Sequence, residues 1–557
     1  MSVSSVCGCC VCPTHRVQGV GLRLPASPGW AGPAWGQLEG MVAWLGGSEA
    51  MNAGHQEVEA LVGVEGRKLQ QMLLQGHLDE RAARETRRTG LTGGDGVVRP
   101  YVEKGHCRPL MSVFGLVTVN RLAYRGVPAH RQAGISTSGG DGPVPVDAAG
   151  SGVVPVDGAV RGVVNLYPAD AVLNLPVGKY SAGLARLVAV EAARGSYDEV
   201  VAAIERATGV VLGKRQVEGL ARGAAVDVDA FYAARRPTAG TVDQVLVLQA
   251  DGKGVVMRPE GLREATAKAA AKAGDGKLVT RLSPGEKRGR KRMAEVVAVC
   301  DVAPAPRGIQ DIIPAGPSRR RRGPGRKPGP VATGKWLAAS VTDDIPTMIK
   351  AMFEEAERRD PTHARAWVAL VDGNRDQLSA IQAEAAAREV TVKIIVDFIH
   401  VIEYVWKAAW TFFDPGDPDA ETWVGDQART ILTGRAVDAA AAITHRADTG
   451  AFTGRQRKGA DEAVGYLTSK RPYLDYATAL REGWPIATGV IEGACRYLIK
   501  DRMDITGARW SLPGAEAILK LRALRSNGDF DAYWTWHQEQ ELTRNHLTRY
   551  QQLDPAA

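Results

Sequence analysis

The chain has little cysteine and no long apolar run. Its seven cysteines in 557 residues are too few for a disulfide scaffold. No stretch of eighteen uncharged apolar residues occurs, which argues against a membrane-spanning helix. The first residues also lack an uninterrupted apolar core behind a basic start, so we expect no secretory signal. These absences favour a protein of the reducing cytoplasm that does not act at a membrane.

The composition is that of a globular protein. Hydrophobic residues make up 45% of the chain and charged residues 24%. These proportions exclude a wholly disordered, collagen-like or coiled-coil chain. The length allows three or four folding units with buried cores.

Four of the cysteines crowd into the first twelve residues, with His15 close by. They are Cys7, Cys9, Cys10 and Cys12. Their adjacent and alternate spacing departs from the paired spacing of zinc ligands, and no second ligand pair follows. We therefore favour an unstructured leader over a zinc site.

Basic residues are concentrated in one segment of the chain. Seventy Lys and Arg against sixty-two Asp and Glu give a net charge of +8. Residues 281–330 alone hold thirteen Lys and Arg and four Asp and Glu, a local excess of nine positive charges. This pattern favours a polyanionic partner, nucleic acid first, with a solvated basic loop as the alternative.

A run of arginines in this segment has the composition of an arm that enters the minor groove of DNA. The run comprises Arg319, Arg320, Arg321, Arg322 and, after Gly-Pro-Gly, Arg326. It departs from the Arg-Gly-Arg-Pro core of an AT-hook. We therefore expect non-specific phosphate contact, which weakens steeply as salt rises.

The first 170 residues fall into three segments of different composition. Residues 1–50 are rich in Gly, Pro and Trp without a sustained period, so we expect a poorly ordered extension. Residues 51–133 are expected to contain a helix over 56–85 and a short β segment over 110–124. A Gly, Pro and Val linker follows at 134–170.

Residues 171–238 show helical periodicity. Helices are expected over 180–193, 197–208 and 214–232. A Gly-containing turn precedes the third helix, which opens with Lys214 and Arg215. This order suits a helix-turn-helix that reads DNA, and many helical bundles share it.

Residues 239–404 show strand and helix patterns of an α/β core with a mixed five-stranded sheet. Strands are expected at 245–248, 295–300, 335–341, 366–371 and 390–396, and helices at 345–358 and 376–388. Three strands, a helix, a strand, a helix and a strand is the order of an RNase H-like fold. We expect an all-helical insertion at 405–486, the last part of the core at 487–540 and a tail at 541–557.

Two aspartates lie where an apolar strand gives way to glycine, namely Asp251 and Asp372. The first and fourth strands of such a sheet are neighbours, so the two carboxylates would meet and hold Mg²⁺, which prefers oxygen ligands. Two ions about 4 Å apart activate the attacking oxygen and stabilise the leaving one in phosphoryl transfer. Taken singly, each Asp-Gly pair favours an ordinary turn.

A two-metal site needs a third acid, and Glu492 in Gly-Val-Ile-Glu-Gly-Ala-Cys-Arg is the candidate. In a helix, Glu492, Arg496 and Lys500 fall on one face at i, i+4 and i+8. A metal-binding carboxylate would then be followed by two phosphate-binding cations. A plain ion pair between Glu492 and Arg496 is the alternative.

Four stretches of the chain resemble bacterial insertion-sequence transposases of the ISKra group, which are relatives of the Mutator-like DDE transposases. They are ADGKGVVMR from Ala250, RKRMAEVVAVCD from Arg290, VDFIHVIEYVWKAAW from Val396 and GVIEGACRYLIKDRMDITGARW from Gly489. The resemblance covers about residues 56–537, and the last stretch is the most specific. It implies DNA transposition on an RNase H-like core, with a helical insertion before the last acid.

The resemblance also implies roles for particular residues. Asp251 would be the first catalytic acid, Asp372 the middle one and Glu492 the last, together holding two Mg²⁺ ions, with Mn²⁺ as a substitute. The family has a Cys- or Asp-x-x-His pair beyond the middle acid, and Asp397 and His400 fit it. We assign this pair a supporting role, and the reversed roles of Asp372 and Asp397 are the alternative.

Trp510 follows the last acid. Related transposases use a nearby aromatic side chain to stack on a displaced base, a contact of about 1–3 kcal/mol. A buried core tryptophan is the equal alternative.

The function so indicated is cleavage of DNA at the ends of an element and joining of the freed 3′-OH to target DNA. The implied partners are terminal inverted repeats, target DNA and a second copy of the chain, in the bacterial cytoplasm at the nucleoid. One rival is an RNase H-like, structure-selective nuclease without strand transfer. The other is a DNA-binding protein without catalysis.

Overall fold

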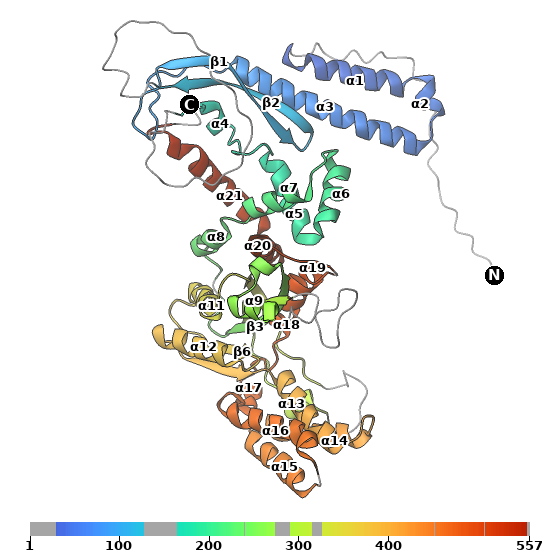
Figure 1. The fold of residues 1–557 in the computed structure, drawn as a ribbon, viewed down its shortest axis with the longest axis vertical. Coiled ribbons are helices and arrows are strands. Elements are labelled where there is room, and N and C mark those ends of the chain that lie inside the picture. The colour runs from blue at the N-terminus through green and yellow to red at the C-terminus, as the bar shows by residue number, and fades with distance from the viewer. Residues whose placement is uncertain are drawn as a thin grey trace, which may run out of the picture. The chain divides into compact units, whose positions relative to one another are not determined.

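The computed structural model describes residues 29–126, 164–272, 290–314 and 326–553, apart from Ala239, Ala451 and Thr506. The chain forms two compact units (Figure 1). Unit 1 comprises the chain up to Leu173 together with its end from Leu547, and unit 2 is Asn174–His546. The cysteine-rich start, most of the expected linker and Arg319 to Arg322 lie outside the described residues.

Unit 1 combines helices with a β-hairpin. Its elements are η1 (Gly29–Ala31), α1 (Gly32–Leu45), α2 (Ser48–Asn52), α3 (His55–Ala83), β1 (Tyr101–Ser112), β2 (Gly115–Arg125), α4 (Pro168–Val172) and η7 (Leu547–Arg549). The expected helix and β segment are confirmed, and the β segment is longer than expected because both strands pair along their length. Gln75 of α3 joins helix to hairpin through hydrogen bonds with the backbone N–H and carbonyl of Thr118, at 2.8 and 3.0 Å.

Helix α1 contradicts the expectation of a poorly ordered extension for the part of 1–50 that the structure describes. Its Ala34, Leu38 and Met41 are wholly or partly buried at helical spacing. Helix α1 packs on α3, with Gln37 donating to Glu65 at 2.7 Å. Its three glycines weaken intrinsic helix propensity, so tertiary packing stabilises this helix.

The end of the chain also differs from expectation. Helix α21 (Phe530–Asn545) runs five residues into the expected tail. The following residues belong to unit 1, where Tyr550 forms a β-bridge with Gly93. Tyr550 is buried in a small apolar cluster with Leu91 and Tyr124.

Unit 2 begins with a helical bundle. It contains α5 (Ala182–Arg194), α6 (Tyr197–Thr208), α7 (Lys214–Gly223) and α8 (Val228–Ala234). The first two expected helices are confirmed, and α6 begins with a capping box formed by Ser196 and Glu199. The third helix ends at Gly223 rather than 232, because the chain turns and Asp227 is bound to side chains of α21.

A mixed five-stranded sheet lies at the centre of unit 2. Its strands are β3 (Val245–Met257), β4 (Arg290–Val302), β5 (Ala332–Ser340), β6 (Trp367–Val371) and β7 (Val392–Val396), in the spatial order β5-β4-β3-β6-β7. Strands β3, β4 and β5 pair antiparallel, whereas β6 runs parallel to both β3 and β7. The expected adjacency of the first and fourth strands is therefore confirmed.

The two helices expected beside the sheet, at 345–358 and 376–388, are confirmed as α11 (Ile345–Arg359) and α12 (Arg375–Ala387), and three short helical elements that were not expected accompany them. These three are η3 (Pro259–Gly261), α9 (Glu264–Lys272) and α10 (Ile309–Ile312). Part of the expected basic loop at 281–330 is a strand instead, because Arg290, Lys291 and Arg292 pair with the far end of β3.

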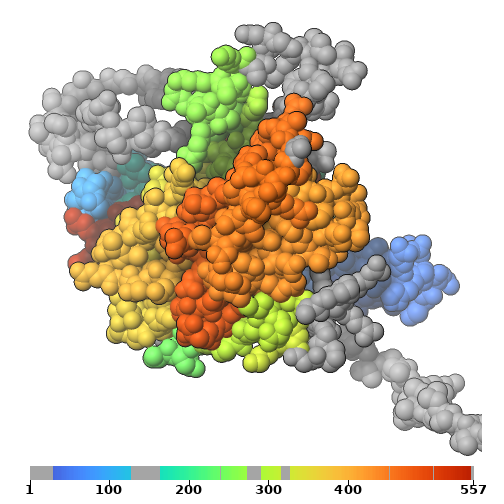
Figure 2. Space-filling model, turned by 90° about the horizontal axis from the view of Figure 1, so that it is seen from below, coloured from blue at the N-terminus to red at the C-terminus, as the bar shows by residue number. Residues whose placement is uncertain are grey.

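An all-helical insertion follows β7, as expected. It comprises α13 (Phe398–Phe412), α14 (Pro418–Leu432), α15 (Ala436–Thr449), α16 (Gly454–Ser469), η5 (Arg471–Tyr473) and α17 (Tyr476–Arg481). Its apolar side chains form one core with Val247, Val368 and Leu370 of the sheet. Figure 2 shows the orange surface of α14 to α16 beside the yellow surface of α11 and α12.

The last part of unit 2 returns to the sheet. It contains α18 (Gly489–Ala494), a π-helix (Cys495–Lys500), α19 (Asp501–Met503) and α20 (Leu512–Asn527) before α21. Of the helices in the described residues, none is both long enough and apolar enough to span a bilayer.

Candidate active site

Five carboxylates line one cleft of about 780 Å³ at an edge of the sheet. They are Asp251 of β3, Glu295 of β4, Asp344 at the start of α11, Asp372, which directly follows β6, and Asp376 in the first turn of α12. Arg263 is the one cation among the residues that line this cleft. The structure therefore brings two of the three expected catalytic acids together and adds three acids that sequence reasoning missed, of which Glu295 is buried.

The register of parallel strands aligns Asp251 with Asp372. Gln249 pairs with Leu370 at the end of the β3–β6 ladder, and both aspartates lie two residues further along. Asp251 is inside a strand rather than at its end, because β4 continues to pair with β3 where β6 stops. Asp251 has no partner residue in β6, because that ladder ends at Gln249. Its side chain can therefore reach the cleft.

Hydrogen bonds hold the two aspartates in place. Asp251 accepts from the backbone N–H of Gly252 at 2.7 Å and from the thiol of Cys495 at 3.3 Å. Burial raises the pKa of Asp251, and the negative charge of Asp372 raises it further against these hydrogen bonds. Asp372 accepts from the N–H of Asn374 at 2.8 Å. A cation is stabilising where carboxylates lie close enough for the charge of one to raise the pKa of another, as Asp372 does for Asp251.

Glu295 is the buried member of the cleft. It lies opposite Gly252 in the antiparallel register and is only 8% exposed. Gln377 donates to it at 3.3 Å. Burial raises its pKa, and the charges of Asp251 and Asp372 add to this effect. The available signal was a single acid within an otherwise apolar run of β4.

Helix α18 positions Glu492 near Asp251, although the two carboxylates do not interact. The helix packs on β3, where the N–H of Ile491 donates to Gln249 at 2.9 Å. Cys495, which donates to Asp251, lies one turn after Glu492. Glu492 itself is exposed and does not line the cleft, and its carboxylate forms no hydrogen bond or ion pair within the described chain.

The expected alignment of Glu492, Arg496 and Lys500 on one helical face is wrong. Residues 495–500 form a π-helix, in which residue i bonds to i+5 instead of i+4. The wider turn pairs Arg496 with Asp501 at 3.7 Å instead of with Glu492. Arg496 and Lys500 are both exposed, so each can still contact a phosphate.

Asp397 holds the segment that leads into α18. It caps α13 by accepting from the N–H of Ile399 at 2.7 Å. It also accepts from the backbone N–H of Thr488 at 3.2 Å and from its hydroxyl. Asp397 follows β7, which is not adjacent to β3. These contacts favour Asp372 as the middle acid and a supporting role for Asp397.

His400 contacts the site indirectly, through Tyr466 of α16. The two rings meet edge to face at 5.7 Å, and Tyr404 stacks on Tyr466 at 4.0 Å. The Tyr466 hydroxyl donates to the backbone carbonyl of Asp372 at 2.6 Å. The helical insertion therefore holds the backbone of Asp372 in place.

Trp510 lies in the core, which argues against base stacking. It is 6% exposed, and its indole N–H donates to the carbonyl of Met503 at 3.0 Å. Arg502 lies over one side of the ring, 4.8 Å from the centroid, and Tyr197 meets it edge-on. Its backbone also pairs with Val256 at the end of β3, so it joins this strand to the helical bundle.

We expect Trp510→Phe to lower the free energy of unfolding by about 1–2 kcal/mol, because the carbonyl of Met503 loses its buried donor. DNA binding should not change. Urea unfolding and a DNA-binding isotherm check the two expectations, with Trp410→Phe as the control because Trp410 is 52% exposed. Weaker DNA binding at unchanged stability would contradict the core assignment.

The expected DNA-contacting cations differ in their surroundings. Lys214 and Arg215 are exposed at the first turn of α7, where Lys214 pairs with Asp198 at 2.6 Å. Arg326 is different, because its guanidinium donates to the carbonyls of Asp311 and Ile312. These bonds give Arg326 a structural role that the composition of the basic run did not indicate.

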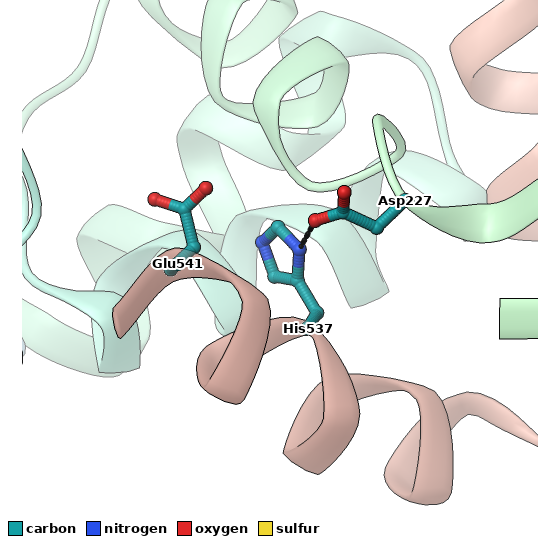
Figure 3. A group of neighbouring side chains, drawn as sticks. All are labelled: Asp227, His537 and Glu541. Carbon is teal, nitrogen blue, oxygen red and sulfur yellow. Dashed lines mark hydrogen bonds and ion pairs between the residues drawn. The ribbon is translucent and has the colours of Figure 1, made fainter. Parts of the chain in front are cut away.

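A second cluster of titratable groups joins the turn before α8 to α21 (Figure 3). Asp227, His537 and Glu541 have ligand atoms within 4.8 Å of one another, and no other group of three in the described chain is that close. Arg544 donates to both oxygens of Asp227 at 2.9 Å and also contacts Glu541. Since a cation already neutralises these acids, we interpret the cluster as an ion-pair network rather than a metal site.

The cleft is a better match to a divalent cation than this network. Its Asp251 and Glu295 have raised pKa values, and the cleft is lined by five acids but one arginine. Carboxylate oxygens are the ligands that Mg²⁺ prefers. The chain matches no family model and no curated protein. The function therefore has to be inferred from the site itself.

Proposed function

We propose that the chain is a DNA transposase with an RNase H-like catalytic core. It would cleave DNA at the ends of an insertion sequence and join the freed 3′-OH to target DNA. The observation that carries this proposal is the alignment of Asp251 with Asp372 at the edge of two parallel strands, beside the helix that bears Glu492.

The topology supports the fold that we propose. The sheet order β5-β4-β3-β6-β7 corresponds to strands 3-2-1-4-5 of the core, with the first three antiparallel and the last two parallel to the first. This is the arrangement expected of an RNase H-like sheet. The helical insertion separates β7 from α18, as the resemblance to DDE transposases implies.

The acids would act by holding divalent cations. Asp251, Asp372 and Glu492 would bind Mg²⁺, which supplies charge neutralisation and activation of an oxygen nucleophile when bound. Cys495 keeps Asp251 in place, because burial and the adjacent carboxylate raise its pKa and leave the thiol protonated as a donor. Tyr466 holds the backbone of Asp372. Arg496 and Lys500 would bind DNA phosphates beside the acids.

The proposal is tested with the full-length protein and a plasmid that carries its coding sequence and the flanking DNA. With Mg²⁺ we expect strand breaks at two positions that flank the gene and products in which those ends are joined to a second plasmid. Both should disappear when the cation is chelated. Sequencing across the new junctions measures the result.

The two rival functions give different outcomes in this assay. Breaks without joined products, even from pre-cleaved ends, would replace the transposase with a nuclease. DNA binding without strand breaks at any concentration of divalent cation would show that the chain is a DNA-binding protein without catalysis. The family resemblance implies that two copies of the chain bring the two DNA ends together. The mass of the protein–DNA complex measures the number of chains in it.

A further inference from the structure

A buried lysine, Lys470, directly follows the last turn of α16. It caps this helix and is 8% exposed. Its ammonium group forms no ion pair or hydrogen bond with any described residue, although the side chain is surrounded by protein. The negative charge of Asp372 acts on it without direct contact, and Asp372 is a carboxylate that we assign to metal binding. A buried cation is unfavourable unless a counter-charge lies nearby, so Lys470 would be stabilised further by an anion.

The position of Lys470 is defined by the loop after β6. Tyr466 and Lys470 are four residues apart on α16 and so lie on one face of the helix. Both contact the same glycine: a Cβ on Gly373 would lie 2.9 Å from the Tyr466 hydroxyl and 3.3 Å from Cε of Lys470. Since the Tyr466 hydroxyl donates to the carbonyl of Asp372, Lys470 lies directly beside the catalytic loop.

A second cation lies near Lys470, at the start of α12. Arg375 is the first residue of α12, three positions after Asp372, and it is exposed. It forms no ion pair within the described chain, and its charge acts on Lys470. Gln382 of α12 donates to the Tyr473 hydroxyl at 3.0 Å, so α12 and the segment after Lys470 are held together.

Two neighbouring cations flank Asp372, whose carboxylate is assigned to the metal. The charge of Asp372 acts on Lys470, but neither Asp372 nor Asp376 forms an ion pair with Lys470 or Arg375 in the described chain. Neither cation lines the acidic cleft, so they would contact a group next to the scissile position rather than the reacting phosphate.

We propose that Lys470 and Arg375 form a phosphate subsite for the DNA backbone next to the catalytic acids. The inference rests on the proposed function, since it takes DNA as the substrate of the cleft. The subsite would fix one phosphodiester beside Asp372, and the helical insertion would thereby take part in positioning the strand for cleavage. Lys470 and Arg375 are positioning residues in this scheme.

The test measures how DNA affinity depends on salt. The probe is a short fluorescent DNA duplex of random sequence, with Ca²⁺ in place of Mg²⁺ so that binding is measured without cleavage. Each phosphate contact contributes about 0.9 to the slope of log K against log salt concentration. We expect Lys470→Met and Arg375→Gln each to reduce the slope by about 0.9, and Lys470→Arg to retain it.

Matched controls use cations elsewhere on the insertion. Lys458→Met changes an exposed lysine at the opposite end of α16, and Arg435→Gln changes an exposed arginine before α15. Both should keep the wild-type slope. Lys470 is buried, so Lys470→Met can change the slope through misfolding, whereas Arg375 is exposed and Arg375→Gln should fold normally. Arg375→Gln therefore tests the subsite independently of folding. Wild-type slopes for both Lys470→Met and Arg375→Gln would overturn the subsite.

The outcomes separate this inference from the proposed function. Normal cleavage and joining by the wild type, with unchanged slopes for both variants, would contradict the subsite alone. Reduced slopes in a protein that never cleaves DNA would support the subsite and contradict the transposase activity. A wild type that does not bind the duplex would contradict both proposals.

Discussion

Replacing Asp251 by Asn should reduce DNA cleavage by about 1,000-fold or more, equivalent to about 4 kcal/mol of transition-state stabilisation. The amide keeps the size of the side chain but loses the negative charge that would hold a divalent cation. Its one oxygen can still accept from the N–H of Gly252, while the amide NH2 takes the place of the oxygen that accepts from Cys495. The loss of this one hydrogen bond should leave the fold intact. Initial rates of plasmid cleavage in Mg²⁺, compared at equal bound DNA, measure the effect.

The control for this variant is Asp461→Asn. Asp461 is an exposed aspartate on α16 that pairs with Arg457 at 2.9 Å, and its loss should leave cleavage unchanged. Asp372→Asn should reproduce the defect of Asp251→Asn. Cleavage by Asp251→Asn at the wild-type rate would rule out the site.

The same assay decides the middle acid. Asp397→Asn should lower stability and slow cleavage only moderately, because Asp397 holds Thr488 and the start of α13 rather than lining the cleft. Complete loss of cleavage in Asp397→Asn, with Asp372→Asn active, would reverse the two roles.

Replacing Asp301 by Ala should lower the free energy of unfolding by about 3–5 kcal/mol. Asp301 of β4 accepts from Arg359 at 3.0 Å and from Arg365 at 2.6 Å, and all three side chains are at most 10% exposed. Without Asp301, the guanidinium of Arg365 keeps only its hydrogen bond to the carbonyl of Gln244. The guanidinium of Arg359 keeps its hydrogen bonds to the carboxylate of Glu355 and the carbonyl of Gly334. Urea unfolding followed by tryptophan fluorescence measures the loss.

The matched control removes an exposed aspartate. Asp438 pairs with Arg435 at 3.7 Å with both side chains about 60% exposed, so Asp438→Ala should change stability by at most about 1 kcal/mol. Equal effects of the two substitutions would show that the arginines around Asp301 find other partners.

The sequence by itself determined the order of the elements in unit 2. The apolar runs at Val245 and Trp367 and the helical periods of α11, α12 and α6 are local signals, so each element appears within a few residues of its expected position. Aspartate followed by glycine after two such runs also marked Asp251 and Asp372 before any strand pairing was known. Periodicity and turn chemistry act over a few residues, which is why these features could be predicted.

Only the tertiary structure decided how the site is assembled. The length of β3 beyond Asp251 depends on β4, and the burial of Glu295 and Trp510 depends on elements that are distant in sequence. The π-helix after α18 replaced the expected helical face, and Lys470, at the end of α16, lies against Gly373 in the loop after β6. Burial, charge coupling and register arise from contacts between distant segments, and no local pattern in one sequence encodes them.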